Sequence, residues 1–197
     1  MHRLLGVVTD CGDSAVTLPL ALLVFVVLLV VHERRIALRW VLMVAGCGAA
    51  IGALKLVFGA CTPRLGFLHI VSPSGHTAMS TGIYGSLALL VGSSLRPASR
   101  RAVTTAAALL IAVIAVSRVL LHFHDTPEII LGLLVGLLAV AWFRAALRRG
   151  PPRGLPVAWL ALGGLAVVLA MHGTRANVEP DVRALAGWLR LSVPWCR

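Results

Sequence analysis

Two short stretches of the sequence carry residues that together could transfer a phosphoryl group. The first, at 73–76, reads Pro-Ser-Gly-His, and the second begins with Ser117 and Arg118 and continues to His124 and Glu128. One imidazole can attack phosphorus, while another can protonate the oxygen that leaves. Cations and free helix amides can hold the phosphoryl oxygens. These residue types therefore indicate a two-histidine site for a phosphate ester or pyrophosphate.

Three basic residues accompany these stretches. Lys55 is the one lysine among the 18 basic residues of the chain, and Arg64 and Arg118 follow it. Lysine and arginine are the side chains that commonly bind phosphate. The sequence therefore predicts a strongly cationic end of the molecule around the two histidines.

Two helix starts are predicted beside the same residues. Ser72 and Pro73 form a cap-then-proline pair, and Thr-Pro-Glu at 126–128 repeats it. Backbone amides at a helix N-terminus attract anions. We therefore expect the amides near Ser74 and Gly75 to point toward the phosphate.

The order and spacing of the two stretches resemble the signatures of the type 2 phosphatidate phosphatase (lipid phosphate phosphatase) superfamily. Those signatures are Pro-Ser-Gly-His and Ser-Arg-(five residues)-His-(three residues)-Asp, after an upstream Lys-(six residues)-Arg-Pro. The resemblance runs from Lys55 to Glu128, and the predicted six-helix layout is similar too. It implies a metal-independent phosphatase that works through a phosphohistidine and uses no cofactor.

The resemblance also implies a role for each matched residue. His124 would be the nucleophile, His76 the general acid, and Glu128 the acid that orients and polarises His124. The residues expected to bind the phosphoryl oxygens are Lys55, Ser74, Gly75 and Arg118.

The sequence departs from the family pattern at two positions. Glu128 stands where the pattern has Asp, and six residues after Lys55 the chain reads Thr62-Pro63 instead of Arg-Pro. Arg64 follows directly. Either Arg64 supplies the missing guanidinium, or the site binds its phosphate with one cation fewer.

Several nearby residues have simpler interpretations. His69 and His122 are expected to be ordinary loop histidines, and Asp125 a solvated acid held in reserve for the role of Glu128. Four glycines are expected to serve helix packing. They are Gly82, Gly85, Gly132 and Gly136.

Composition identifies the environment of this site. Apolar residues make up 59% of the 197 residues and charged residues only 13%, about half the share in an ordinary soluble domain. A disordered chain, a disulfide-framework peptide and a typical soluble enzyme are thereby excluded. The net charge of +11 comes from short clusters between long uncharged runs, which does not indicate nucleic-acid binding. We interpret the chain as an integral membrane protein.

Six uncharged runs predict six transmembrane helices once flanking residues complete the shorter ones. The predicted fold is all-α, a membrane bundle in one domain spanning 1–197, with the catalytic motifs at 55–128. The second run is extended to Gly59 and the fourth to Leu121. The runs are 14–31, 40–54, 77–95, 102–117, 129–143 and 154–171.

Arginine distribution predicts the orientation. Clusters at 34–39, 96–101 and 144–153 hold ten arginines and follow the first, third and fifth runs. By the positive-inside rule, these loops are cytoplasmic. The site and both termini then face the outside of what we expect to be a bacterial inner membrane. The apolar positions of the tail at 175–197 predict a helix in the membrane interface, with a frayed tail as the alternative.

Four cysteines are too few for a disulfide framework. Cys47 is expected in the membrane core, and Cys11, Cys61 and Cys196 on the outer side as free thiols. No cluster of His, Cys or carboxylates has zinc-like spacing, so no metal is expected.

The function favoured by these observations is hydrolysis of a lipid phosphate or pyrophosphate, with undecaprenyl pyrophosphate and phosphatidate both open. Membrane lipids are the expected partners, and the oligomeric state stays undetermined. One alternative is transfer of the phosphoryl group to another lipid or sugar. Another is a lipid-phosphate-binding or transport protein that has lost catalysis.

Overall fold

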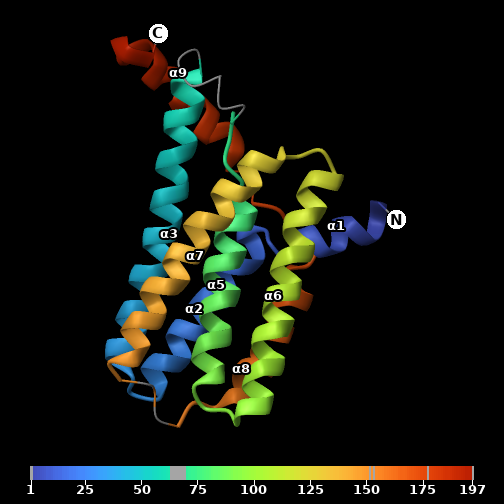
Figure 1. Ribbon diagram of the computed structural model, residues 1–197, viewed down its shortest axis with the longest axis vertical. Coiled ribbons are helices and arrows are strands. Elements are labelled where there is room, and N and C mark those ends of the chain that lie inside the picture. Colours follow the sequence, from blue (N-terminus) through green and yellow to red (C-terminus); the bar gives the residue numbers. More distant parts are fainter. Residues whose placement is uncertain (1, 63–69, 151, 153, 177, 197) are drawn as a thin grey trace.

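The computed structural model describes residues 2–62, 70–150, 152, 154–176 and 178–196. Over these residues the chain is built from helices and contains no strand (Figure 1). The helices are α1 (His2–Asp10), α2 (Ser14–Val30), α3 (Arg34–Ala60), α5 (Gly75–Gly92), α6 (Pro97–Leu120), α7 (Thr126–Arg148), α8 (Val157–Met171), α9 (Glu179–Ser192) and the 3-10 turn η2 (Pro194–Cys196).

The all-α membrane bundle predicted from the sequence is confirmed. Each of the six uncharged runs falls within or largely overlaps one helix: α2, α3, α5, α6, α7 or α8. By length and hydropathy α3, α6 and α7 can each cross a membrane, while α2 and α8 are apolar but shorter. The number of crossings and their orientation stay predictions.

Small residues let α5 occupy the centre of the bundle, where it packs chiefly against α7 and α6. A Cβ atom added to Gly136 would lie only 2.5 Å from the Thr81 Cβ, and one added to Gly85 would lie 2.7 Å from a methyl group of Val140. Both positions on the α5–α7 contact therefore require glycine. The packing role predicted for these glycines is confirmed.

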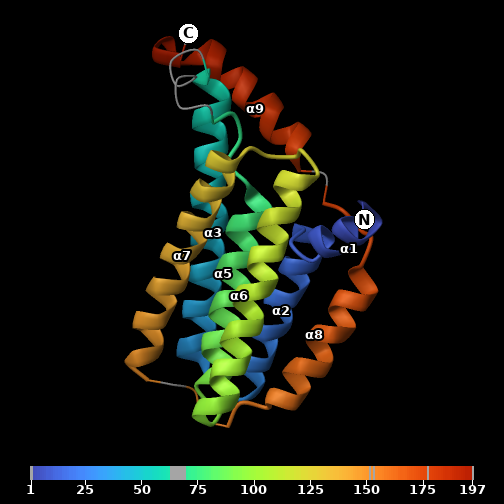
Figure 2. The same cartoon turned by 45° about the vertical axis from the view of Figure 1, so that its right-hand side comes forward.

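The helices run so that the site residues gather at one end. The C-terminal ends of α2, α5 and α7 lie at the end of the bundle opposite the site (Figure 1). The ends of α3 and α6 and the starts of α5 and α7 lie at the other end, where α9 crosses them (Figure 2). The two motif stretches thus meet, as expected from helices that alternate in direction.

Both chain ends add structure at the site end. The sequence analysis did not predict α1, which packs against α6. The tail does form a helix, α9, and it packs against the end of α3. The expectation of free outer cysteines is wrong for one pair, because Cys61 is disulfide-bonded to Cys196. The tail folds back over α3, a contact across 135 residues that local spacing could not indicate. Cys11 and Cys47 are free.

Candidate active site

His124 is held by Glu128. Its Nδ1 atom lies 2.7 Å from Glu128 Oε2, and the two side chains are only 9% and 8% exposed. His124 lies in the turn before α7, and Glu128 lies in the first turn of that helix. Because Nδ1 is occupied by the carboxylate, the ring has its Nε2 atom left to react.

The longer side chain of Glu128 also fastens the loop before α5. Its Oε1 atom accepts hydrogen bonds from the amides of Val71 at 2.8 Å and Ser72 at 2.7 Å. The Ser74 amide donates to the Glu128 carbonyl at 3.1 Å. A Cβ on Gly132, one turn further along α7, would lie 2.5 Å from the Ser74 carbonyl oxygen. Glycine there allows the two motif stretches to approach this closely.

The surroundings of His124 lower its pKa from the usual value. Burial is the largest cause, and the positive charges of Arg118 and Lys55 act in the same direction. The hydrogen bond that His124 donates to Glu128 raises the pKa but does not outweigh these effects. The lowered pKa favours the neutral imidazole, the form that can act as a nucleophile.

His76 has a carboxylate partner of its own that comes from another part of the chain. Its Nε2 atom lies 3.2 Å from Asp13 Oδ2. A quarter of the His76 side chain is exposed, whereas only 6% of Asp13 is. His76 belongs to the first turn of α5, and Asp13 caps α2 by accepting a hydrogen bond from Ala15. The sequence analysis did not identify Asp13.

Lys55 also pairs with an acid that was not predicted. Its Nζ atom lies 2.5 Å from Glu179 Oε2 and 3.2 Å from Ser72 Oγ, and the serine hydroxyl donates to Glu179 Oε1 at 3.1 Å. Burial alone would raise the pKa of Glu179, but the hydrogen bond and charge of Lys55 outweigh it and the pKa is lowered. Glu179, in the first turn of α9, thus forms an ion pair with the lysine that was predicted to bind phosphate.

Arg118 is half-buried at the end of α6. Its guanidinium lies 4.4 Å above the ring of Phe123, and its Nη1 donates to Thr9 Oγ1 at 3.4 Å. The buried Nε–H has no hydrogen-bond partner among the described residues. An unpaired donor on a buried cation is costly, and an anionic ligand would satisfy it.

The start of α5 differs from the prediction by two residues. Ser74, not Ser72, is the N-cap, and its fully buried Oγ accepts from the amide and hydroxyl of Thr77 at 3.4 and 3.1 Å. Ser74 is thus committed to the helix. The Gly75 amide lies in the first turn, where helical amides have no intrahelical partner, so it remains suited to an anion. A Cβ on Gly75 would lie 3.5 Å from the Lys55 side chain.

The structure brings together the predicted site residues that it describes. His124, Glu128, His76, Lys55, Arg118 and the Gly75 amide lie at one end of the bundle. Arg64, like His69, lies outside the described residues. His122 and Asp125 are exposed, in agreement with their simpler interpretation. Within the described ranges, no group of three or more His, Cys, Asp or Glu side chains could hold a metal ion.

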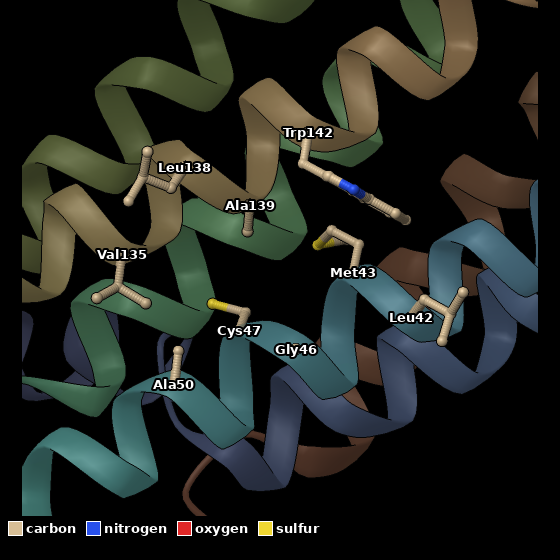
Figure 3. A pocket seen from close by; sticks show the side chains of 9 residues that line it. All are labelled: Leu42, Met43, Gly46, Cys47, Ala50, Val135, Leu138, Ala139 and Trp142. Carbon is tan, nitrogen blue, oxygen red and sulfur yellow. The ribbon is translucent and has the colours of Figure 1, made fainter.

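A cavity of about 350 Å³ lies away from these polar residues, between α3 and α7 (Figure 3). Lys55 follows its nearest lining residue on α3, Ala50, by five residues, about 7.5 Å of helix rise. The cavity is too apolar to be the reaction centre and suits a hydrocarbon chain. It is lined by Leu42, Met43, Gly46, Cys47, Ala50, Val135, Leu138, Ala139 and Trp142.

Comparison with known proteins agrees with this geometry. The PAP2 superfamily model matches residues 36–150. This match defines the class of the protein as a helical membrane protein with a phosphatase-type site. The chain belongs to the PAP2 superfamily, whose members are in general phosphatases. It is 32% identical over 176 residues to an uncharacterized 22.5 kDa protein in the cps region of Klebsiella pneumoniae, covering 85% of this chain and 83% of that protein. No solved structure matches the chain.

Proposed function

We propose that the protein is a metal-independent membrane phosphatase that hydrolyses a lipid phosphate or pyrophosphate through a phosphohistidine on His124. One observation carries the proposal. His124 is held through Nδ1 by Glu128, its pKa is lowered by burial, and it lies within the electrostatic reach of Lys55 and Arg118. An oriented imidazole beside two cations is what attack on a phosphoryl group requires.

The reaction has two steps. In the first, His124 Nε2 forms a bond to phosphorus while the bond to the leaving oxygen breaks, and that oxygen takes a proton from His76. In the second, water attacks the phosphohistidine and returns a proton to His76, which releases phosphate from His124. Lys55, Arg118 and the Gly75 amide stabilise the charge on the phosphoryl oxygens in both steps.

The surroundings support a lipid as the substrate. The site residues lie at the end of a bundle whose outer surface is apolar, so the hydrocarbon chain stays in the bilayer while its headgroup enters. The apolar cavity between α3 and α7 begins about one to two helical turns from Lys55. Undecaprenyl pyrophosphate and phosphatidate are the two substrates we would compare.

Two observations support a periplasmic site in a bacterial inner membrane. The ten clustered arginines lie in loops that follow the first, third and fifth runs, opposite to the site under the positive-inside rule. The Cys61–Cys196 disulfide joins the tail to the site end, and disulfides persist on the oxidising side of a membrane. The Klebsiella relative supports a bacterial origin.

The test is phosphate release by the detergent-purified full-length protein from both lipids, in the presence of EDTA. Wild type is expected to remain active, and His124→Ala to lose at least about a thousandfold. His122→Ala is the matched control, because this exposed histidine lies two residues away, and its activity should be unchanged.

Other results would point elsewhere. Full activity of His124→Ala, or complete inhibition by EDTA, would contradict the proposal. Turnover that yields a phosphorylated acceptor instead of free phosphate would identify a phosphotransferase. Binding of both lipids without turnover by folded wild type would favour a binding or transport protein.

A further inference from the structure

The N-terminal turn contributes a buried carboxylate to the predicted general acid. Asp13 lies in the turn between α1 and α2, 63 residues before His76, and outside the residues that the PAP2 superfamily model matches. Its Oδ2 atom is 3.2 Å from His76 Nε2. Nothing in the family match assigns a role to this residue.

Asp13 is held rigidly enough to orient a partner. Its other oxygen, Oδ1, accepts from the amides of Ala15 at 2.8 Å and Ala176 at 2.9 Å. The turn itself is fixed against α5, because the hydroxyl of Tyr84 donates to the Cys11 carbonyl at 2.6 Å. A Cβ on Gly12 would lie 3.6 Å from the His76 Cβ. The carboxylate therefore has little freedom to leave the histidine.

We propose that Asp13 is a positioning residue for His76, fixing the ring and its protonation pattern so that His76 Nδ1 exchanges the catalytic proton. The inference rests on the function proposed above. A carboxylate accepts hydrogen bonds and donates none, so the Nε2 atom that faces Asp13 carries hydrogen. The proton given to the leaving oxygen then comes from Nδ1, and the imidazole remains bonded to Asp13 through Nε2–H.

The ionisation of Asp13 supports this role. Burial would raise its pKa, but hydrogen bonds from His76, Ala15 and Ala176 outweigh burial and lower the pKa to about 2. Asp13 is therefore charged throughout the range in which an enzyme is assayed. A carboxylate that stays charged accepts the hydrogen bond from His76 Nε2–H throughout this range, so the ring keeps the same orientation.

Leaving-group dependence separates positioning of the acid from simple structural support. An alkoxide leaves only with a proton, whereas a nitrophenolate leaves without one. Asp13→Asn retains the N-cap of α2, since Asn caps as well as Asp does, but it removes the charge. We expect kcat/KM to fall about 10- to 100-fold on a long-chain alkyl phosphate. On a nitrophenyl phosphate that carries an alkyl chain of the same length, kcat/KM should change by less than about threefold, because nitrophenolate leaves without a proton from His76.

Two variants complete the design. His76→Asn should show the same selective loss to a greater degree, and adding Asp13→Asn to it should cost nothing more, because the two residues act as one unit. Asp10→Asn is the matched control. Asp10 is another buried acid of the same turn region, but its carboxylate binds Arg175 at 3.2 Å.

The outcomes distinguish this inference from the proposed function. Equal loss on both substrates in Asp13→Asn, with wild type active, would overturn positioning in favour of a structural role. No loss on the alkyl phosphate would overturn it outright. Wild type that hydrolyses neither substrate would instead contradict the phosphatase itself, and the inference with it.

Discussion

The two histidines of the site are supported by carboxylates in different ways. His124 pairs with Glu128, which lies four residues later in the first turn of α7. His76 pairs with Asp13 from the N-terminal turn. Lys55, a third residue of the site, likewise pairs with Glu179 from α9, near the other end of the chain. We call the first the motif half of the site, and the Asp13 and Glu179 contacts the terminal half.

The difference between the two halves reflects what each must do. In the motif half, the Glu128 carboxylate binds both the nucleophile His124 and the backbone amides of Val71 and Ser72. The reacting group and the loop before α5 are therefore fixed together. The terminal half places a negative charge beside His76 and another beside Lys55, two residues that the motifs supply. Loss of the motif half should therefore stop the chemistry, whereas changes in the terminal half should adjust it.

Glu128→Gln tests the motif half and has the largest expected effect. The amide cannot replace a carboxylate that accepts from His124 and from the amides of Val71 and Ser72. We expect kcat to fall about 10³- to 10⁴-fold, as when the acid that orients a catalytic histidine is lost. Steady-state kinetics on the preferred lipid measure it.

Glu128→Asp is the control for this prediction, because it restores the residue that the family pattern has. The shorter side chain keeps the charge but cannot reach the imidazole and both amides at once, so a loss of about 10- to 100-fold is expected. A Glu128→Gln enzyme more active than Glu128→Asp would contradict the orienting role of the charge.

The motif half was predictable because its geometry is local. His124 and Glu128 are only four residues apart, on either side of the start of α7, and the resemblance supplied their roles. The six helices were likewise predictable, since a bilayer requires long uncharged runs. Helix ends were less so: Pro73 suggested that α5 starts after Ser72, but the cap is Ser74.

The terminal half was not predictable from one sequence. Asp13 reads equally well as an ordinary N-cap, and Glu179 as an acid in the first turn of an amphipathic helix. Their partners lie 63 and 124 residues away, and only the packing of α1 and α9 on the bundle identifies them. The same packing brings Cys196 to Cys61.

Glu179→Gln tests the terminal half, with a smaller effect. It removes the carboxylate that occupies Lys55, so the lysine is free for the phosphoryl oxygens. We expect KM to fall about two- to fivefold, the equivalent of a partly exposed ion pair, with kcat unchanged. Asp181→Asn, on the same helix turn of α9, is the control. A rise in KM would instead assign Glu179 to substrate binding.

The smallest effect at pH 7 concerns the protonation of His124. Its lowered pKa keeps the ring neutral at pH values where an ordinary histidine gains a proton. At pH 7 His124 and an ordinary histidine are both mostly neutral, so their modification rates differ there by less than about twofold.

Diethylpyrocarbonate reacts with neutral imidazole, and mass spectrometry of the peptide containing His124 reports its modification. The midpoint of the reaction rate should lie below pH 6.5. In Glu128→Gln it should move further down, because the hydrogen bond that raises the pKa is lost while burial and the two cations remain. A midpoint that moves up in this variant would contradict the hydrogen bond between His124 and Glu128 as a cause that raises the pKa of His124.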